Sequence, residues 1–281
     1  MSSRTDYLGP LKNILLATDG SEYSEGAIQE AIYLAKSCVA KLSVIYVLEV
    51  NAELETEGPK IVEKMENTAR EHLDRIRKTA AQDNVECEVI VSRTDQPYKA
   101  IIEEAGKRTA DVIVMGRRGR TGLKKILMGS VTAKVIGYAS AKVLVVPKDA
   151  EIKVDTIMVA TDGSTSCEAA EREAIHMSKR CHPKVKRTFA LSVAPADSDL
   201  PRAQANVERV KEKAKEHGVE IEPIATVGRR YEMILKTAEE KNADIIIMGT
   251  YGRTRIDKLL MGSVSERVVG LSHCPVLIVK A

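Results

Sequence analysis

The chain has 281 residues, of which 44% are hydrophobic and 30% are charged, and its formal net charge is +3. This globular composition excludes the disordered, collagenous and fibrous classes. The charge is even along the chain, with 22 Lys and Arg against 21 Asp and Glu in residues 1–150, and 21 against 19 in the rest. Because aromatic residues make up only 3% and Trp is missing, neither a basic face nor a stacking platform for nucleic acid is expected.

The features that report on the cellular compartment favour the cytoplasm. No apolar run approaches the roughly 18 residues of a membrane-spanning helix, and the first residues, MSSRTDYLGPLKN, lack the apolar core of a secretion signal. The cysteines are odd in number and far apart, and no CxxC occurs, which favours free thiols in a reducing compartment. We therefore expect a cytoplasmic protein without a membrane partner.

Two long segments of the sequence occur twice. The segment NILLATDGSEYSEGAIQEAIYLAK at 13–36 is echoed by TIMVATDGSTSCEAAEREAIHMSK at 156–179, and the stretch at 110–131 is echoed at 243–264. The first pair of segments has an offset of 143 residues and the second pair an offset of 133. The stretch that joins the two segments is therefore ten residues shorter in the second copy. A period of this length is far too long for a solenoid. The sequence therefore predicts one domain that has been duplicated.

We take residues 1–150 and 151–281 as the two domains and follow the first in chain order. Short β-branched apolar runs predict strands at 14–18, 42–47, 85–91, 112–115 and 143–146. Helical spacing predicts helices at 22–37, 60–79, 98–108 and 131–138. The long second helix has one apolar face, formed by Ile61, Met65, Ala69, Leu73 and Ile76. This alternation predicts an α/β fold of two tandem doubly wound domains, each an open parallel sheet of five strands with helices on both faces.

The arrangement of the strands decides where a ligand would bind. A flavodoxin-like or Rossmann-like order would place the first and fourth strands side by side, at the point where the strand order reverses. Ligands bind there, outside the carboxyl ends of the strands. The loops that follow these two strands are therefore the candidate functional loops.

The loop after the first strand reads Ala-Thr-Asp-Gly-Ser in both copies, at 17–21 and 160–164. A carboxylate such as Asp19 or Asp162 at the end of a strand can accept hydrogen bonds from ribose hydroxyls or hold a metal beside phosphates. The alternative is structural, because Asp19 or Ser21 can cap the helix that follows. The spacing alone leaves both interpretations open.

The loop after the fourth strand has the same glycine frame, G-x2-G-x9-G-S, in both copies. Its glycines and closing serines are Gly116, Gly119, Gly129 and Ser130 in the first copy and Gly249, Gly252, Gly262 and Ser263 in the second. Glycines let backbone N–H groups approach an anion, and a helix that begins at the closing Gly-Ser points its free N–H groups into the loop. The frame predicts a phosphate cradle that is neither a P-loop nor a GxGxxG motif. Its structural alternative is that the two serines are helix N-caps, and residues 263–266 fit a capping box.

Other motifs give weaker signals. The sequence has no GxSxG elbow and no HExxH helix, so we assign no catalytic residues. His182 beside Cys181 and His273 beside Cys274 lack further ligands at a metal-binding spacing, so no metal site is predicted. The first glycine loop also contains a basic run that belongs either to a solvated face or to the phosphate site, namely Arg117, Arg118, Arg120, Lys124 and Lys125.

Together these features resemble the universal stress protein family. The resemblance rests on ATDGS after the first strand, on the glycine frame after the fourth, and on the closing runs AKVLVVPK at 141–148 and CPVLIVK at 274–280. It covers nearly all of both copies, so the chain resembles a tandem member of the nucleotide-binding branch of that family. The resemblance implies a strand order of 3-2-1-4-5 in each copy. It also implies an adenine nucleotide, ATP or AMP with or without Mg, between the two loops.

The resemblance further implies which residues contact the nucleotide. In the first copy they are Ala17, Thr18, Asp19, Val47, Met115, Gly116, Gly119, Gly129, Ser130 and Val131. In the second copy they are Ala160, Thr161, Asp162, Val193, Met248, Gly249, Gly252, Gly262, Ser263 and Val264. The second strand of this copy, taken as 185–193, contains Lys186 and Arg187, which weakens the match at Val193.

The expected function is binding of an adenine nucleotide in stress response or regulation, with one site per repeat. No general base is evident near the predicted phosphates, whereas a catalyst would need a positioned base or a metal clamp. Two alternatives stay open. One is a slow ATPase or nucleotidyl-transfer enzyme on the same fold, and the other is an interaction scaffold whose loops bind no nucleotide.

Two further expectations concern partners and charge. The last strands, at 143–146 and 276–279, would each be an apolar sheet edge, and pairing them within the chain would protect both. Association into a homo-oligomer is also open. Residues 116–130 contain five cations and no acid, whereas residues 249–263 contain three cations and one acid. We therefore expect the first site to favour the more highly charged nucleotide.

Overall fold

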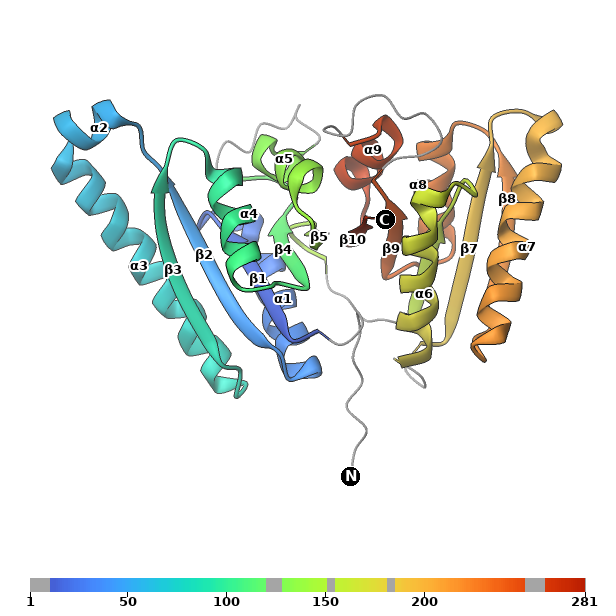
Figure 1. Ribbon diagram of the computed structural model, residues 1–281, viewed down its shortest axis with the longest axis horizontal. Helices are drawn as coiled ribbons and strands as arrows, with labels where there is room; N and C mark the ends of the chain where they lie inside the picture. Colours follow the sequence, from blue (N-terminus) through green and yellow to red (C-terminus); the bar gives the residue numbers. More distant parts are fainter. Residues whose placement is uncertain (1–10, 120–127, 151–154, 181–184, 251–260, 281) are drawn as a thin grey trace. The chain divides into compact units, whose positions relative to one another are not determined.

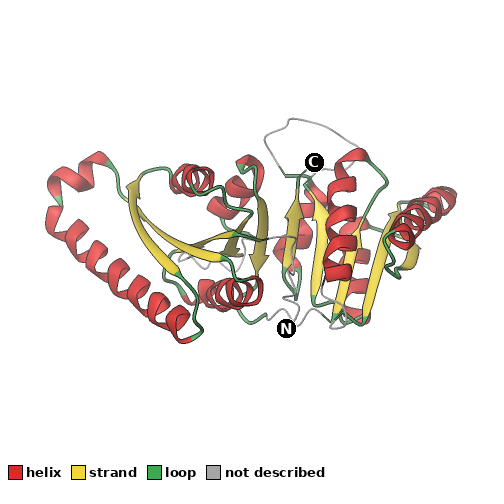
Figure 2. Ribbon diagram, turned by 60° about the horizontal axis from the view of Figure 1, so that its bottom comes forward, coloured by secondary structure: helices red, strands yellow, loops and turns green. Residues whose placement is uncertain are grey.

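A computed structural model describes residues 11–119, 128–150, 155–180, 185–250 and 261–280. The chain divides into two compact units, Leu11–Asp149 and Ala150–Ala281, and each is described by itself. In both units a parallel sheet carries helices on its two faces (Figure 1, Figure 2).

The first unit contains a five-stranded parallel sheet. Its strands are β1 (Asn13–Thr18), β2 (Lys41–Glu49), β3 (Cys87–Thr94), β4 (Val112–Gly116) and β5 (Lys142–Val146). Their order is β3-β2-β1-β4-β5, and each neighbouring pair is parallel. The predicted doubly wound sheet and its strand order are therefore confirmed in this unit.

Helices cover both faces of this sheet. They are α1 (Glu25–Cys38), α2 (Ala52–Glu57), α3 (Pro59–Gln82), α4 (Pro97–Lys107) and α5 (Ser130–Tyr138), with a short 3-10 turn, η1 (Glu22–Ser24), before α1. Helix α1 packs on β1 and β4, and α3 packs on β2 and β3. Helices α4 and α5 pack against each other and lie in front of the sheet in Figure 1.

The second unit repeats this architecture. Its strands are β6 (Thr156–Ala160), β7 (Arg187–Ala194), β8 (Glu222–Val227), β9 (Ile245–Gly249) and β10 (Val276–Val279). Their order, β8-β7-β6-β9-β10, is again 3-2-1-4-5 within the unit. The helical elements are η2 (Thr165–Cys167), α6 (Glu168–Arg180), η3 (Asp197–Asp199), α7 (Leu200–Glu216), α8 (Arg230–Glu240) and α9 (Ser263–Leu271).

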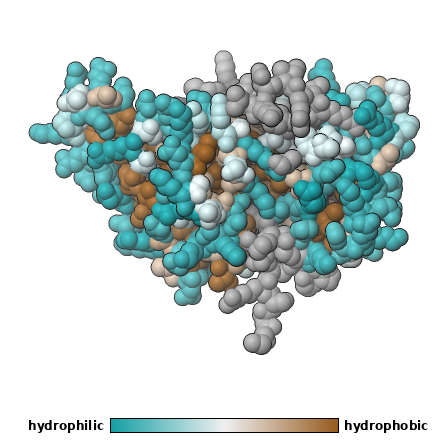
Figure 3. All heavy atoms as spheres, in the orientation of Figure 1, coloured by the Kyte–Doolittle hydropathy of each residue, from teal (hydrophilic) through white to brown (hydrophobic). Residues whose placement is uncertain are grey.

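The core of each unit lies along its central strands. Every residue of β4 and of β9 is buried, because helices cover both faces of the sheet at these positions. The surface shown in Figure 3 is mostly hydrophilic, with small hydrophobic patches. Within the described ranges, no helix has the length and apolar character needed to cross a membrane.

The structure corrects three details of the expected elements. The strand expected at 85–91 begins later, at Cys87, because the chain turns at Asn84 with a positive φ of 59°. The apolar face of α3 uses Val62, which is buried, in place of Ile61, which is 57% exposed. In the second unit β7 begins at Arg187, so Lys186 precedes the strand and Val193 lies near its carboxyl end.

The segment after β2 forms a short helix in the first copy that the apolar periodicity did not predict. Helix α2 spans Ala52–Glu57, contains no buried residue and holds three glutamates. Its start is capped by Asn51, whose Oδ1 accepts a hydrogen bond from the Leu54 N–H at 2.8 Å. A helix without a buried face leaves no hydrophobic pattern in the sequence.

Candidate functional site

The two candidate loops of each repeat begin side by side. In the first unit Ala17 of β1 is paired with Met115 of β4, and in the second Ala160 of β6 is paired with Met248 of β9. These pairs lie at the carboxyl ends of neighbouring parallel strands, where the strand order reverses. The predicted meeting of the two loops is therefore present in both units.

Glycines allow the loops to lie against each other. A Cβ added to Gly116 would lie 2.6 Å from the Tyr23 carbonyl oxygen, and one on Gly119 would lie 2.7 Å from Asp19 Oδ2. In the second unit, a Cβ on Gly249 would lie 2.9 Å from the carbonyl oxygen of Ser166. At Gly116 and Gly249 the near atoms are backbone oxygens, so a larger residue would force the chain apart, and at Gly119 the Asp19 side chain would have to move. The predicted site residue Gly252 lies outside the described residues.

The aspartates of the first loop have a structural role. Asp19 Oδ1 accepts hydrogen bonds from the Ser21 N–H at 3.0 Å and from its hydroxyl at 2.7 Å. Asp162 Oδ1 accepts one from the Ser164 N–H at 2.9 Å. One carboxylate oxygen of each aspartate thus closes a turn of the loop, which agrees with the structural interpretation of these aspartates. The other oxygen of Asp19 faces the glycine loop at Gly119.

The threonines of the first loop turn their side chains into the protein. Thr18 Oγ1 is hydrogen-bonded with Ser24 Oγ at 3.0 Å and with His72 Nε2 at 3.2 Å. Burial, and then the positive charge of Arg75, lower the pKa of His72 below its ordinary value, so the imidazole is neutral at pH 7. The resemblance places Thr18 near adenosine, but only its backbone can face a ligand there.

In the second repeat, the corresponding threonine is hydrogen-bonded to a charged side chain. Thr161 Oγ1 donates a hydrogen bond at 2.7 Å to Glu171 Oε1, and Glu171 is only 1% exposed. Arg209 holds this carboxylate with two hydrogen bonds, at 2.9 Å and 2.6 Å. The same backbone turn is therefore supported by a neutral network in one repeat and by a buried carboxylate, paired with a partly exposed arginine, in the other.

The helices that follow the glycine loops begin without side-chain caps. Gly129 and Gly262 are the N-cap residues of α5 and α9, and neither helix start has a side-chain cap hydrogen bond. Ser130 and Ser263 are exposed and are the first helical residues. The capping interpretation of both serines, including the capping box at 263–266, is therefore wrong. Within the described ranges, no side chain caps the first N–H groups of either helix.

A hydroxyl one turn later ties each helix to its strand. Thr132 Oγ1 donates to the carbonyl oxygen of Gly116 at 3.1 Å, and Ser265 Oγ donates to that of Gly249 at 3.0 Å. Sequence reasoning missed both residues, although a hydroxyl stands two positions after the closing serine in each copy. These bonds fix the helix starts over the ends of β4 and β9.

We expect Thr132→Val to destabilise the first unit by about 1–3 kcal/mol, because the buried Gly116 carbonyl loses its donor while the side-chain volume is kept. Urea unfolding of this variant and of Thr132→Ser, which keeps the hydroxyl, measures the effect. Equal stability of the Val and Ser variants would contradict this role of the hydroxyl.

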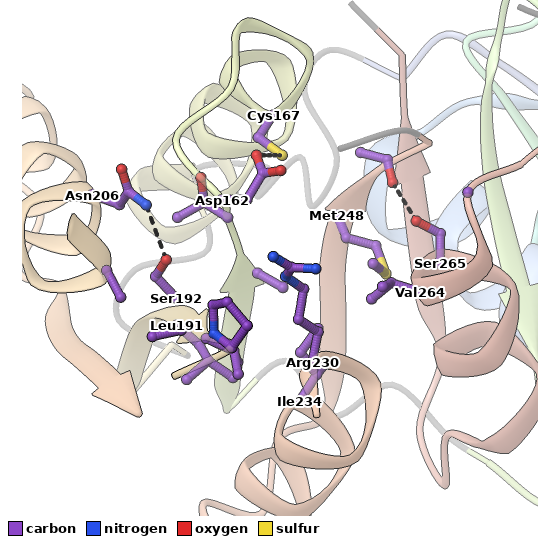
Figure 4. Close-up of a pocket in the computed structure, with 18 of the residues that line it drawn as sticks. Asp162, Cys167, Leu191, Ser192, Asn206, Arg230, Ile234, Met248, Val264 and Ser265 are labelled. Atoms are coloured by element: carbon purple, nitrogen blue, oxygen red, sulfur yellow. Dashed lines mark hydrogen bonds between the residues drawn. The ribbon is translucent and has the colours of Figure 1, made fainter. Parts of the chain in front are cut away.

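The second unit contains a cavity of about 360 Å³ at this place (Figure 4). It is lined by nine of the residues predicted for the second site, namely Ala160, Thr161, Asp162, Val193, Met248, Gly249, Gly262, Ser263 and Val264. The structure thus brings both loops, the end of β7 and the start of α9 around one space. Its volume lies within the range of roughly 300–1,000 Å³ that is typical of ligand pockets.

Sequence reasoning missed the part of the cavity wall that comes from helices. These residues are Asp199, Arg202, Ala203 and Asn206 from the start and body of α7, and Arg230 and Ile234 from α8. The apolar periodicity predicts which face of a helix is buried, but it does not identify polar residues at a helix start. Cys167 also lines the cavity, and burial raises the pKa of its thiol.

In the first unit, a tyrosine occupies the position that corresponds to Ser192 at the cavity of the second unit. Tyr46 is paired with Thr18 and is 2% exposed, and its ring lies against His72 with centroids 6.0 Å apart. In the second unit Ser192 and Asn206 are joined instead by a hydrogen bond of 3.1 Å. Of the other residues predicted for the first site, Ala17 and Met115 are buried, and Val47 and Val131 are half-buried.

Most of the charged residues counted in the glycine loops lie outside the described residues. They are Arg120, Lys124 and Lys125 in the first copy and Arg253, Arg255, Asp257 and Lys258 in the second. Arg117 is described and half-buried, and burial, with Arg118 nearby, lowers the pKa of its guanidinium. The comparison of charges in the two glycine loops did not include Arg202 and Arg230, which bring positive charge to the second cavity from α7 and α8.

Among the residues that the structure describes, no three His, Cys, Asp or Glu side chains form a group that could hold a metal ion. Cys181 and His182 lie outside these residues. Cys274, next to His273, is buried, and its Sγ forms a hydrogen bond of 3.4 Å with Ser272 Oγ. Burial raises the pKa of this thiol to about 11. Such a thiol has little thiolate character at neutral pH.

Comparisons with known proteins agree with this architecture. The model of the universal stress protein family matches residues 10–147 and 153–280. A universal stress protein of Synechocystis is 27% identical over 95% of this chain and 99% of that protein. One from Methanocaldococcus jannaschii is 36% identical over 44% of this chain and 81% of that protein.

A solved structure extends the likeness over the full length. The crystal structure of a universal stress protein from Archaeoglobus fulgidus has a TM-score of 0.78 and 25% sequence identity, and the match covers 98% of this chain and 97% of that one. Both glycine frames and both sheets fall within the ranges that the family model matches. The chain therefore belongs to the universal stress protein family, with two copies of the family's domain in tandem.

Proposed function

We propose that each repeat binds one adenine nucleotide between its two loops, and that the protein acts through this binding in stress response or regulation in the cytoplasm. The phosphates would accept hydrogen bonds from the first N–H groups of α5 or α9. The base would lie by the end of β2 or β7, next to Val47 or Val193, and the ribose would lie between these two parts.

The observation that carries this proposal is that the described fold does not require glycine at 129, and the backbone angles do not require it at 262. Both have φ −61° and ψ 144°, a conformation open to any residue. A Cβ on Gly129 would meet no atom of the described protein closer than 3.6 Å. A glycine that the described backbone and packing do not require, beside helix N–H groups that no described side chain caps, is suited to close approach of a phosphate.

The residues present also fit a nucleotide that brings Mg²⁺ with it. Magnesium is commonly held by one or two carboxylates together with substrate phosphates, and it keeps several waters. Each first loop supplies one carboxylate of this kind, Asp19 or Asp162, at the edge of the proposed site. The metal would neutralise phosphate charge, and Asp19 or Asp162 would hold its position.

Calorimetric titration of the full chain with ATP and with AMP tests the proposal. We expect a stoichiometry that approaches two nucleotides per chain, because both repeats carry an intact glycine frame and an open helix start. Native mass spectrometry of the purified protein should detect co-purified adenine nucleotide. A stoichiometry of zero with both nucleotides would overturn the proposal, and turnover measured with and without Mg²⁺ would reveal an enzyme.

A further inference from the structure

One residue of the second cavity has no counterpart in the first repeat. Arg230 is the first residue of α8, and its guanidinium reaches into the cavity between Leu191 and Met248 (Figure 4). The first residue of the corresponding helix α4 is Pro97. Both helices have 11 residues and bury an isoleucine at their fifth position, Ile101 or Ile234. The two helix starts are therefore equivalent, and they differ in charge.

Arg230 is exposed, and the helix start does not require a cation at this position. A cation is unfavourable at the N-terminus of a helix, where the dipole is positive, and proline is a favoured residue there. The neighbouring Arg229 is compensated by Glu232, with a distance of 3.2 Å between the charged groups. Within the described parts of the chain, Arg230 forms no ion pair, and neither does Arg202 on the same cavity wall.

The cavity wall also contains two carboxylates, those of Asp162 and Asp199. Asp162 Oδ1 accepts hydrogen bonds from the Ser164 N–H and from the Cys167 thiol, at 2.9 Å and 3.4 Å. Asp199 is the half-buried N-cap residue of α7. Neither pairs with Arg230 among the described residues. A guanidinium that projects into a ligand-sized space is suited to a planar anionic group such as a phosphate, which it binds through two parallel hydrogen bonds.

We propose that Arg230 holds a second anionic group of the ligand, carried on the ribose and not on the 5′ phosphate chain. The inference rests on the proposed nucleotide site, in which the 5′ phosphates lie at the start of α9 and the base lies by the end of β7. Arg230 comes from a third element and reaches the space between these two positions, where the ribose would lie. The second repeat would therefore favour nucleotides that carry a second phosphate on the ribose, for which adenosine 3′,5′-bisphosphate is the probe, over nucleotides with a single phosphate chain.

Two nearly matched probes test this selectivity. ADP and adenosine 3′,5′-bisphosphate both carry adenosine and two phosphate groups, and they differ in where the second phosphate is attached. We expect the second site, measured by calorimetry in the full-length Gly129→Val variant, to bind the 3′,5′-bisphosphate about tenfold more tightly than ADP. Tenfold corresponds to about 1.4 kcal/mol, less than a fully desolvated ion pair would give.

Substitutions at the two equivalent helix starts provide the matched controls. Arg230→Gln should reduce the affinity ratio of the two probes to about one, whereas Arg229→Gln next to it should leave the ratio unchanged. The first site, measured in the Gly262→Val variant, lacks this guanidinium and should show a smaller preference, and Pro97→Arg should increase it there. Thermal unfolding of each variant verifies that it is folded.

The outcomes separate this proposal from the one on which it rests. If ADP binds to the second site but the two probes bind equally, the role of Arg230 is wrong and the nucleotide site stands. If Arg230→Gln weakens both probes by the same factor, the side chain acts on the base or the 5′ phosphates, and the proposal is overturned. If neither probe binds at the second site, both proposals fail for this repeat.

Discussion

Replacing Gly129 with valine is expected to abolish nucleotide binding by the first repeat while leaving its fold intact. The described part of the protein leaves room for the substitution, because Gly129 has φ −61° and ψ 144° and a Cβ there would lie 3.6 Å from the nearest described atom outside its chain neighbours. It is incompatible with a phosphate seated on the helix start, because the isopropyl group would occupy that space. Calorimetry should show the stoichiometry fall from two to one, with affinity at the altered site at least tenfold weaker.

Glycines elsewhere in the same unit supply the controls for this experiment. Gly106→Val adds bulk where no atom lies within 4 Å, so it should leave binding unchanged. Gly116→Val should instead damage the fold, because its Cβ would lie 2.6 Å from the Tyr23 carbonyl oxygen. Gly262→Val should remove the other site. If the Gly129→Val variant still binds two nucleotides per chain, the phosphates do not lie at the start of α5.

The largest loss of stability is expected from Arg209→Leu in the second repeat. The change leaves the carboxylate of Glu171, which is 1% exposed, without its two hydrogen bonds from the guanidinium. Removing one partner of a fully buried ion pair typically costs about 3–5 kcal/mol, and because the Arg209 side chain is 33% exposed we expect a smaller loss of about 2–3 kcal/mol. Urea unfolding of the second repeat, followed by circular dichroism in the full chain, measures this loss.

A neighbouring lysine is the matched control for this substitution. Lys213 Nζ lies 3.8 Å from Glu171 Oε2, but its side chain is 40% exposed. Lys213→Leu should therefore cost at most about 1 kcal/mol, as expected for a solvated pair. If Arg209→Leu costs no more than Lys213→Leu, water or another group satisfies Glu171, and the ion pair is not what supports the loop.

The fold could be predicted from the sequence largely because its signals are repeated and local. The strands are continuous apolar runs. The glycine frame follows the fourth strand in both copies, so each copy confirms the order of elements read from the other. The errors arose where local patterns are ambiguous. Ile61 and Val62 are both apolar neighbours at the start of α3, and the periodicity could not decide which of them the turn would bury.

The candidate site could be predicted only in part, because its walls come from distant segments. The loops that follow β1 and β4, or β6 and β9, carry recognisable motifs. Arg230 and Asn206 have no motif, and they reach the cavity only because the sheet brings α7 and α8 to its edge. The capping box at 263–266 has the right residue types, but Ser265 uses its hydroxyl on Gly249 and the helix starts at Ser263 without a cap.

The contacts that hold the side chains of Thr18 and Thr161 differ between the repeats, and this difference restricts how the repeats can evolve. Ile28 in the first repeat stands where the second has Glu171, in the frame that matches Asp19 with Asp162. An Ile28→Glu change alone would bury a carboxylate among groups arranged for a neutral network, and Glu171→Ile alone would leave Thr161 Oγ1 without its acceptor. Either support can be converted into the other only by several simultaneous substitutions. The duplicated halves are therefore separated by an epistatic barrier, and residues at this position cannot be exchanged between them one at a time.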